Sequence, residues 1–162
     1  MALLAGAFVL GGPARAQTLS LNGNEVLSSI SGTTTVITNG GSANALLIFT
    51  GSQPYSGIIE NGSNTTGLIV DSAGTLNLSG ANTYTGPTII TAGTLALSGT
   101  AGTIASSSGL TVASGGTFDV SALPSANQPT VTVAVAAGVE LPGVYTAMVT
   151  WSPGLNVYGS TS

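Results

Sequence analysis

The sequence predicts an all-β protein, a parallel β-helix (β-solenoid) with single-stranded coils of about 19–25 residues. The first observation is a series of short apolar alternations separated by Gly, Asn and Thr, which is typical of half-buried strands joined by tight turns. The second is a repeated phrase: residues 74–80 return as 93–99 and again as 116–121, at offsets of 19 and 23 residues. A phrase that recurs at this period indicates a solenoid.

The repeated phrase also predicts which side chains point inward. Its inward positions are Leu76, Leu78, Leu95, Leu97, Phe118 and Val120, and its outward positions are Thr75, Thr94 and Thr117, then Asn77, Ala96 and Asp119. We expect equivalent residues to stack from coil to coil, so that the inward set forms a continuous core and neighbouring strands pair in parallel. An immunoglobulin-like sandwich would not require its strands to repeat one phrase in register.

The composition excludes several classes of protein. The 162 residues suffice for one ordinary domain, 43% of them are apolar, and β-branched and small polar residues predominate over good helix formers. Only 4% are charged, against roughly 25% in a typical globular protein. With one Arg and no Lys, binding to nucleic acid or to anionic membrane surfaces is not expected.

Residues 1–16 match the pattern of a secretory signal peptide. The apolar run 2–12 is too short to span a bilayer, and Pro13 ends it. Ala14 and Ala16 are small residues at the −3 and −1 positions of a cleavage site, although a cationic segment is missing at the start. The alternative is a short buried N-terminal strand. Cleavage would leave a mature chain with neither Lys nor Arg.

The region 17–123 is expected to hold the β-helix repeats. A lead-in is followed by short strands that mostly end at Gly or Asn, residues that tolerate the backbone of tight turns. The lead-in is 17–32, and the strands lie within 33–38, 45–50, 55–60, 68–71, the repeated phrase, 109–113 and 116–121. After residue 16 no stretch carries a helical stripe of apolar residues.

A second, partial echo suggests that the coil length varies. Residues 55–59 resemble 84–90 at an interval of 29 residues, which places Tyr55 and Tyr84 at equivalent corners of two coils. Pro87 lacks the N–H that a strand ladder needs, so we expect it at a corner between strands.

Beyond residue 123 the texture of the sequence changes. Residues 124–129 suggest a loop, 130–135 a β-branched strand, and 141–145 a turn into a strand that runs to Trp151. The repeated phrase does not return here, so we expect 124–162 to form divergent terminal β coils.

Residues 74–86, continuing through 92–97, resemble the autotransporter-associated β-strand repeat, which occurs in passenger domains of bacterial type V secreted proteins. The phrases at 104–112 and 115–120 are similar to ones that follow this repeat in the family. The residues that carry the resemblance as a structural motif are Gly74, Thr75, Leu76, Leu78, Gly80, Asn82, Tyr84, Gly86, Gly93, Thr94, Leu95, Leu97, Gly116, Thr117, Phe118 and Val120.

The resemblance implies a right-handed parallel β-helix, exported by the general secretory route and displayed on, or released from, the outer membrane of a Gram-negative bacterium. It also implies that the repeat assists translocation and folding of the passenger and carries no catalysis. Family members usually end in a membrane translocator barrel. We expect that barrel in the full-length protein and not in this chain, which stops at Ser162 without a series of amphipathic strands.

The inventory of chemical groups leaves little room for catalysis. Without His, Cys or Lys there is no Ser-His-Asp triad, no zinc site of the usual kind and no Schiff base, and no P-loop is present. We therefore expect no catalytic residue, no metal site and no cofactor. The remaining alternative is a carboxylate pair or a loose Ca²⁺ site formed by Asp119 and Glu140, which lie 21 residues apart. The other carboxylates are Glu25, Glu60 and Asp71.

These observations predict a structural passenger segment of an exported protein, without nucleic-acid partners or a small-molecule substrate. One alternative is an adhesin stalk that binds glycans or host surfaces, through the outward Thr column or through aromatic side chains that stack on sugars. The aromatic candidates are Tyr55, Tyr84, Tyr145, Trp151 and Tyr158. A degenerate β-helix enzyme acting on glycans is a third possibility.

Overall fold

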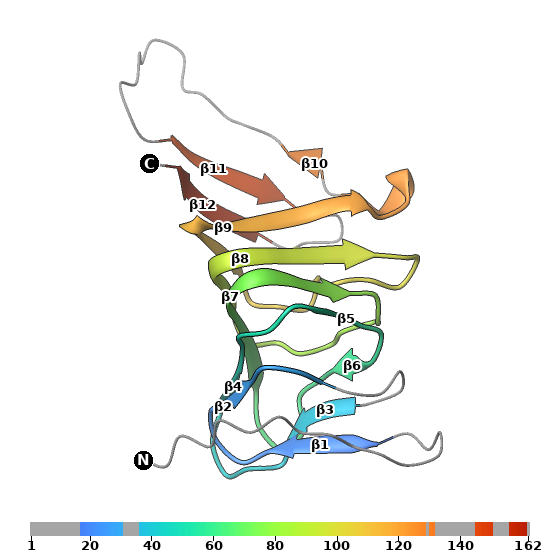
Figure 1. Cartoon of the computed structure of the whole chain (residues 1–162), viewed down its shortest axis with the longest axis vertical. Helices are drawn as coiled ribbons and strands as arrows, with labels where there is room; N and C mark the ends of the chain where they lie inside the picture. Colours follow the sequence, from blue (N-terminus) through green and yellow to red (C-terminus); the bar gives the residue numbers. More distant parts are fainter. Residues whose placement is uncertain (1–16, 31–35, 129, 132–144, 151–155, 162) are drawn as a thin grey trace.

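The computed structural model describes residues 17–30, 36–128, 130–131, 145–150 and 156–161, and these form short strands joined by turns. Parallel strands stack as a β-solenoid of about five turns, which confirms the predicted fold class (Figure 1). Helical structure in the described part is limited to the 3₁₀ segment η1 (Ser125–Asn127). Among these residues no helix is long enough and apolar enough to cross a membrane.

One wall of the solenoid is a small parallel sheet. It consists of β1 (Thr18–Leu21), β3 (Val36–Asn39) and β6 (Ile58–Ile59), in that spatial order. The register places Leu19 beside Ile37 and Ile37 beside Ile59, so each strand lies directly over the one from the preceding turn. Alternation along β3 buries Ile37 and Asn39 while their neighbours stay partly exposed.

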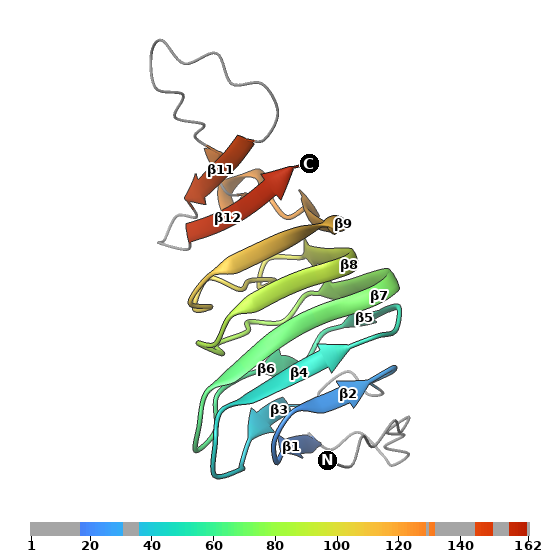
Figure 2. The same ribbon diagram turned by 90° about the vertical axis from the view of Figure 1, so that its left-hand side faces the viewer.

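A larger sheet contains the longest strands of the chain. Its parallel part consists of β2 (Glu25–Leu27), β4 (Ala45–Phe49), β7 (Thr66–Leu78), β8 (Thr88–Ser98) and β9 (Leu110–Ala122), with β5 (Gln53–Tyr55) paired to the end of β7. Figure 2 shows β4, β7, β8 and β9 stacked in chain order. Leu47, Leu68, Thr88 and Leu110 occupy successive rungs, so the chain advances one turn in about 20 residues.

The long strands bend at a corner, and this changes the prediction of single-stranded coils. The β7–β8 register shifts between Val70 and Thr75, and the β8–β9 register shifts between Ile90 and Ala92. Gly93 adopts a φ of 74° at this corner, a conformation that favours Gly. Small residues at the corners divide each turn into short extended pieces. Each turn therefore contributes segments to three parallel ladders, which are the β1–β3–β6 wall, the ladder of the first halves of β7–β9 and the ladder of their second halves.

A single apolar core fills the space between the ladders. Its largest fully buried side chains are Tyr55, Tyr84, Phe49, Leu21, Ile37, Leu47, Ile59, Leu68, Leu76, Leu78, Ile90 and Leu95. Burying each aliphatic side chain of this size contributes about 1.5–3 kcal/mol before the conformational entropy cost is counted. On β9 the core thins, because Phe118 and Val120 are only partly buried against it.

The stacking pattern changes after β9. The strands β10 (Thr130–Val131), β11 (Tyr145–Thr150) and β12 (Asn156–Thr161) pair with one another in antiparallel order. Of these, β12 also pairs in parallel with β9, where Val157 lies beside Leu110. The predicted signal peptide at 1–16, Glu140 and Trp151 lie outside the described residues.

Candidate functional site

The stacked repeat in β7, β8 and β9 is the candidate functional element. Its inward positions Leu76, Leu95 and Phe118 are register partners, as are Leu78 and Leu97. Its outward positions Thr75, Thr94 and Thr117 form a second column, in which Thr75 and Thr117 are exposed and Thr94 is half-buried. Val120 comes directly after Asp119, which is the register partner of Ala96. The register between β8 and β9 then shifts between Ala96 and Ser98.

The glycines of the motif lie where two turns approach each other closely. Gly93 and Gly116 are register partners at the corner. A Cβ on Gly80 would overlap the carbonyl oxygen of Gly57, and a Cβ on Gly86 would overlap that of Thr66. On Gly74 it would meet the side chain of Ser52. These positions therefore require Gly because the neighbouring turn occupies the space of a side chain.

Asn82 is a buried polar residue that joins three successive turns. Only 1% of its surface is exposed. Its Oδ1 accepts from the N–H of Ile59 at 2.9 Å, and its Nδ2 donates to the carbonyls of Gly80 at 3.1 Å and Thr103 at 3.0 Å. Ile59 belongs to the preceding turn and Thr103 to the following one, so Asn82 bonds its own turn to both neighbours.

A second buried polar group is a chain of three hydroxyls. The Tyr84 and Thr88 hydroxyls lie 2.6 Å apart, Thr88 donates to Ser107 at 2.9 Å, and Ser107 donates to the carbonyl of Gly86 at 2.8 Å. Either hydroxyl of the first pair can be the donor. Burial raises the pKa of Tyr84 well above its ordinary value, an effect that the bond to Thr88 partly offsets.

Polar side chains at the corners repeat this bonding between neighbouring turns. Asn24 accepts from the N–H of Leu46 at 2.9 Å, and Asn64 donates to the carbonyl of Gly41 at 2.7 Å. Asn61 accepts from the N–H of Thr85 at 3.1 Å. The partners in these bonds lie 22–24 residues apart in sequence, and the Asn82–Thr103 bond spans 21 residues. In the described part, no buried side-chain nitrogen or oxygen lacks a hydrogen-bond partner.

An outward aliphatic column runs along the first halves of the long strands. Val26, Ile48, Ile69 and Ile89 are register partners in successive turns, and each is half-buried. Beside this column, Thr91 donates to the carbonyl of Val70 and to the carboxylate of Asp71, both at 3.0 Å. Stacked β-branched side chains stabilise a parallel ladder by cross-strand contact, which accounts for their use on an outer face.

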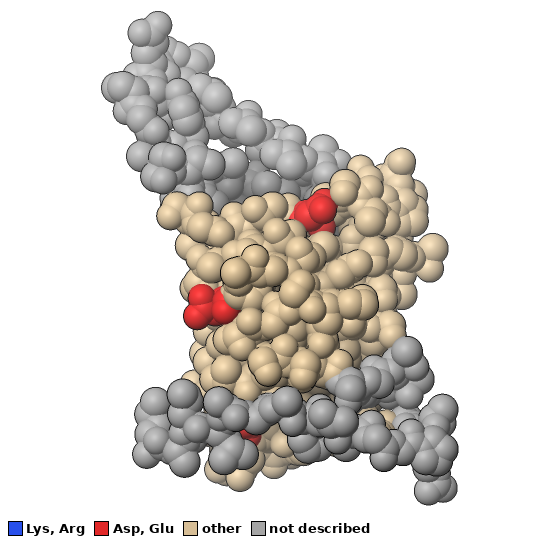
Figure 3. Space-filling view, viewed as in Figure 1, with Lys and Arg blue, Asp and Glu red and all other residues tan. Residues whose placement is uncertain are grey.

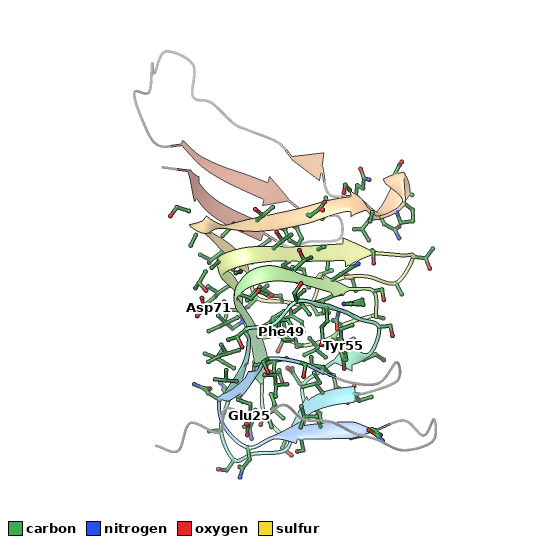
Figure 4. All side chains as sticks on the ribbon, viewed as in Figure 1. Glu25, Phe49, Tyr55 and Asp71 are labelled. Atoms are coloured by element: carbon green, nitrogen blue, oxygen red, sulfur yellow. The ribbon has the colours of Figure 1, made fainter. Side chains whose placement is uncertain are left out.

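The carboxylates of the described part are scattered, as the separate red spots of Figure 3 show. Figure 4 shows Glu25 and Asp71 at different heights along the solenoid. Among the described residues, no three His, Cys, Asp or Glu side chains come together to hold a metal ion. Asp119 has a pKa below its ordinary value because Ser121 donates its N–H to Oδ1 at 2.9 Å and its hydroxyl also bonds. Its predicted partner Glu140 lies outside the described residues.

The predicted equivalence of Tyr55 and Tyr84 is wrong. Tyr55 ends β5 and is the register partner of Leu78, whereas the N–H of Tyr84 donates to the carbonyl of Ile59 on a different wall. Both rings are buried in the core (Tyr55 is labelled in Figure 4). Turns therefore repeat at about 20 residues here. The segments 55–59 and 84–90, which are similar in sequence at an interval of 29 residues, occupy different positions in their turns. Pro87 does lie outside the strands, directly before β8, as predicted.

The comparison with protein-family models finds a repeat to which part of this chain is similar. A model described as the passenger-associated transport repeat matches residues 68–97. Residues 68–97 are similar to this repeat. The passenger-associated transport repeat thus covers most of β7 and β8 with the turn between them, including Leu76, Asn82 and Leu95. Searches of curated proteins and of solved structures find no match.

The passenger-associated transport repeat and the β-solenoid together fit a passenger-type repeat protein of autotransporters. Such a repeat points to an extracellular or cell-surface location. The sequence motif identified the repeat. It did not reveal that Asn82, Thr88 and Ser107 are buried, because Asn, Thr and Ser are ordinary turn residues by composition.

Proposed function

We propose that residues 17–123 are a structural, non-catalytic passenger segment whose turns fold one upon another during export. The protein would pass through the periplasm and cross the outer membrane of a Gram-negative bacterium, to be displayed or released. One observation carries this proposal: Asn82, buried inside the passenger-associated transport repeat, completes its hydrogen bonds only when the turns on both sides are in place.

The bonding of Asn82 makes each turn a template for the next. The Ile59 N–H receives its acceptor from a residue 23 positions later, and the Asn82 amide finds Thr103 another 21 positions on. A buried polar group without a partner costs about 1–3 kcal/mol, so each added turn relieves a cost left by the previous one. Solenoid stability is roughly a sum of terms for single turns and for neighbouring pairs, which favours growth along the axis.

The composition supports passage in an unfolded state. The whole chain has five carboxylates, one Arg and no Lys. Few charges have to be desolvated or neutralised while the chain is extended in a narrow channel. The apolar surface is instead buried turn by turn as the chain emerges, and this burial gives the process a direction.

The proposal is tested by export of the full chain joined to a heterologous translocator barrel in a Gram-negative host. Surface arrival is measured on intact cells by protease accessibility, and folding by the size of the fragment that resists the protease. We expect Asn82→Ala and Leu76→Asp to lower the folded, surface-exposed fraction several-fold. The matched control is Asn22→Ala, since Asn22 is exposed and bonds none of the described residues.

Two outcomes would contradict the proposal. In the first, the wild-type fusion stays in the periplasm. In the second, Asn82→Ala and Leu76→Asp reach the surface as well as wild type although a denaturant titration shows both to be destabilised. Export would then not depend on the stacking of turns.

A glycan-binding stalk is the second candidate, favoured by the register of Thr75, Thr94 and Thr117 on one outer face. It is tested by screening the full chain on a sugar array beside the triple Thr→Val variant, which keeps the shape of each side chain and removes its hydroxyl. Binding that the triple variant loses would support this candidate, and no binding to any sugar would eliminate it.

A further inference from the structure

The chain contains three Asn-Gly dipeptides: Asn22-Gly23, Asn39-Gly40 and Asn61-Gly62. In such a pair the backbone nitrogen of Gly can attack the side-chain amide of Asn, because Gly has no Cβ to hinder the approach. Asn is accordingly among the chemically labile residues of proteins. The attack requires a side chain that is free to rotate and a backbone nitrogen that is not engaged elsewhere. The fold treats the three pairs differently on both counts.

In the Asn39-Gly40 pair, hydrogen bonds hold both the Asn39 side-chain amide and the Gly40 nitrogen. Asn39 is fully buried, its Oδ1 accepts from Gly41 at 3.0 Å, and its Nδ2 donates to Ala43 at 2.9 Å and Thr65 at 3.0 Å. The Gly40 nitrogen donates to the Leu21 carbonyl at 3.1 Å. Neither the electrophilic carbon nor the nucleophilic nitrogen is free to move.

The Asn61-Gly62 pair is held in a similar way. The Oδ1 of Asn61 accepts from the N–H groups of Thr66 at 3.0 Å and Thr85 at 3.1 Å, and its Nδ2 donates to the Thr85 hydroxyl at 2.8 Å. The Gly62 nitrogen donates to the Asn64 carbonyl at 3.3 Å. Two successive turns would have to separate before this amide could rotate.

The Asn22-Gly23 pair has none of these restraints within the described part of the chain. Asn22 is exposed, and neither its amide nor the Gly23 nitrogen bonds a described residue. Gly23 has a φ of 113°, and a Cβ placed on it would meet no atom within 4 Å, so the turn between β1 and β2 leaves open space beside the Cα of Gly23. Of the three pairs, Asn22-Gly23 is therefore the one in which neither the Asn side chain nor the Gly nitrogen is bonded to a described residue.

We infer that Asn22 is the site of spontaneous deamidation and isomerisation in the folded protein. The Gly23 nitrogen loses its proton to solvent and forms a bond to Cγ of Asn22, the Cγ–Nδ2 bond breaks, and ammonia leaves with a proton from water. Water then opens the cyclic imide at either carbonyl. The products are Asp, with an unchanged backbone, or isoaspartate, whose backbone is longer by a methylene group, and either one adds a negative charge.

The inference is tested by incubating the full chain at mildly alkaline pH and body temperature, with and without a denaturing concentration of urea. Peptide mapping by mass spectrometry with electron-transfer fragmentation counts Asp and isoaspartate at each site. In the folded protein we expect Asn22 to react at least about ten-fold faster than Asn39 and Asn61, because reaction at those two sites requires local opening. In urea the three rates should agree within about three-fold, because the folded restraints are gone.

The variant Asn22→Gln serves as the control, since it lacks the short side chain that closes the five-membered ring and leaves Gly23 unchanged. It should abolish isoaspartate formation at this site and leave the slow rates at Asn39 and Asn61 unaltered. The inference is overturned if folded Asn22 stays intact while urea-unfolded Asn22 reacts. It is equally overturned if Asn39 or Asn61 reacts as fast as Asn22 in the folded protein.

Discussion

Gln53 acts as a strand partner for Ile30 through its side chain. Its Oε1 accepts from the Ile30 N–H at 3.0 Å, and its Nε2 donates to the Ile30 carbonyl at 2.8 Å. The two bonds reproduce the pair that a backbone residue would form in a ladder. These two side-chain bonds lie one turn before the backbone pairing of β5 with β7.

Replacing Gln53 by Ala should destabilise the protein by about 1–3 kcal/mol, because a half-buried N–H and carbonyl of Ile30 lose their partners. Urea denaturation followed by circular dichroism measures the change. Gln53→Glu keeps the size and an acceptor but removes the donor, so its loss should be smaller near pH 4, where Glu is partly protonated. A Gln53→Ala protein within about 0.5 kcal/mol of wild type would show that the two bonds add nothing net.

The inward and outward columns of the repeat should respond very differently to truncation. Leu76→Ala leaves a cavity in the core and should cost about 2–5 kcal/mol. Thr75→Ala, at the adjacent exposed position, should stay within about 0.5 kcal/mol of wild type. Both are measured by the same urea titration, and equal losses for the two variants would contradict the assigned faces.

Substitutions at two glycines with positive φ test backbone strain and steric overlap separately. Gly99 has a φ of 70°, and a Cβ there would make only an ordinary contact, 3.9 Å from the Cβ of Ser79, so Gly99→Ala should cost about 1–2 kcal/mol from the left-handed conformation alone. Gly93 has a φ of 74°, but a Cβ there would overlap the Ser72 carbonyl oxygen and lie 2.6 Å from that of Gly74. Gly93→Ala should therefore cost about 4 kcal/mol or more, a loss found only for specific structural clashes. Thermal unfolding compares the two, and a milder effect at Gly93 would refute the close packing of the corner.

Stability should fall in alkaline solution because of Tyr84. Burial raises the pKa of its phenol above the ordinary value of 10.0, so above pH 10 the unfolded chain releases this proton more readily than the folded one. The contribution of Tyr84 is fully present below pH 10 and is lost above it, at up to about 1.4 kcal/mol per pH unit.

Urea midpoints between pH 8 and pH 11.5 measure this effect. The Tyr84→Phe variant, which cannot ionise at this position, should show a shallower fall than wild type. Burial likewise raises the pKa of Tyr55, so part of the slope should remain in Tyr84→Phe and disappear further in the double variant with Tyr55→Phe. An identical alkaline slope in wild type and in both variants would contradict the burial of these phenols.

The repetition in the sequence was sufficient to predict the fold class. Leu76, Leu95 and Phe118 recur with Thr75, Thr94 and Thr117 in the same order, and stacking is the arrangement in which such copies become neighbours. The prediction that Tyr55 and Tyr84 occupy equivalent corners is wrong because it rested on a local likeness and not on the stacking of whole turns. A local likeness does not say on which wall of a turn a residue lies, and that depends on how many residues each corner takes up.

The buried polar contacts could not be predicted from the sequence. Gln53, Asn82 and Ser107 belong to residue types that are common in exposed turns, and nothing local to them differs from Asn22 or Ser114. Their partners lie in other turns, so their burial is a property of the stack. A residue pair at the turn spacing, such as Ile59 with Asn82, is the only signal the sequence contains, and it becomes informative once the register is known.

Because the chain advances one turn in about 20 residues, the length of the solenoid can change in steps of one turn. Neighbouring parallel strands lie about 4.8 Å apart, so each whole turn gained or lost changes the length of the solenoid by that distance. Duplication of a segment such as 68–87 would insert another turn between surfaces that already fit, since Leu68 and Thr88 are register partners. A chain of this design can thus change its length in discrete increments, without inventing a new contact.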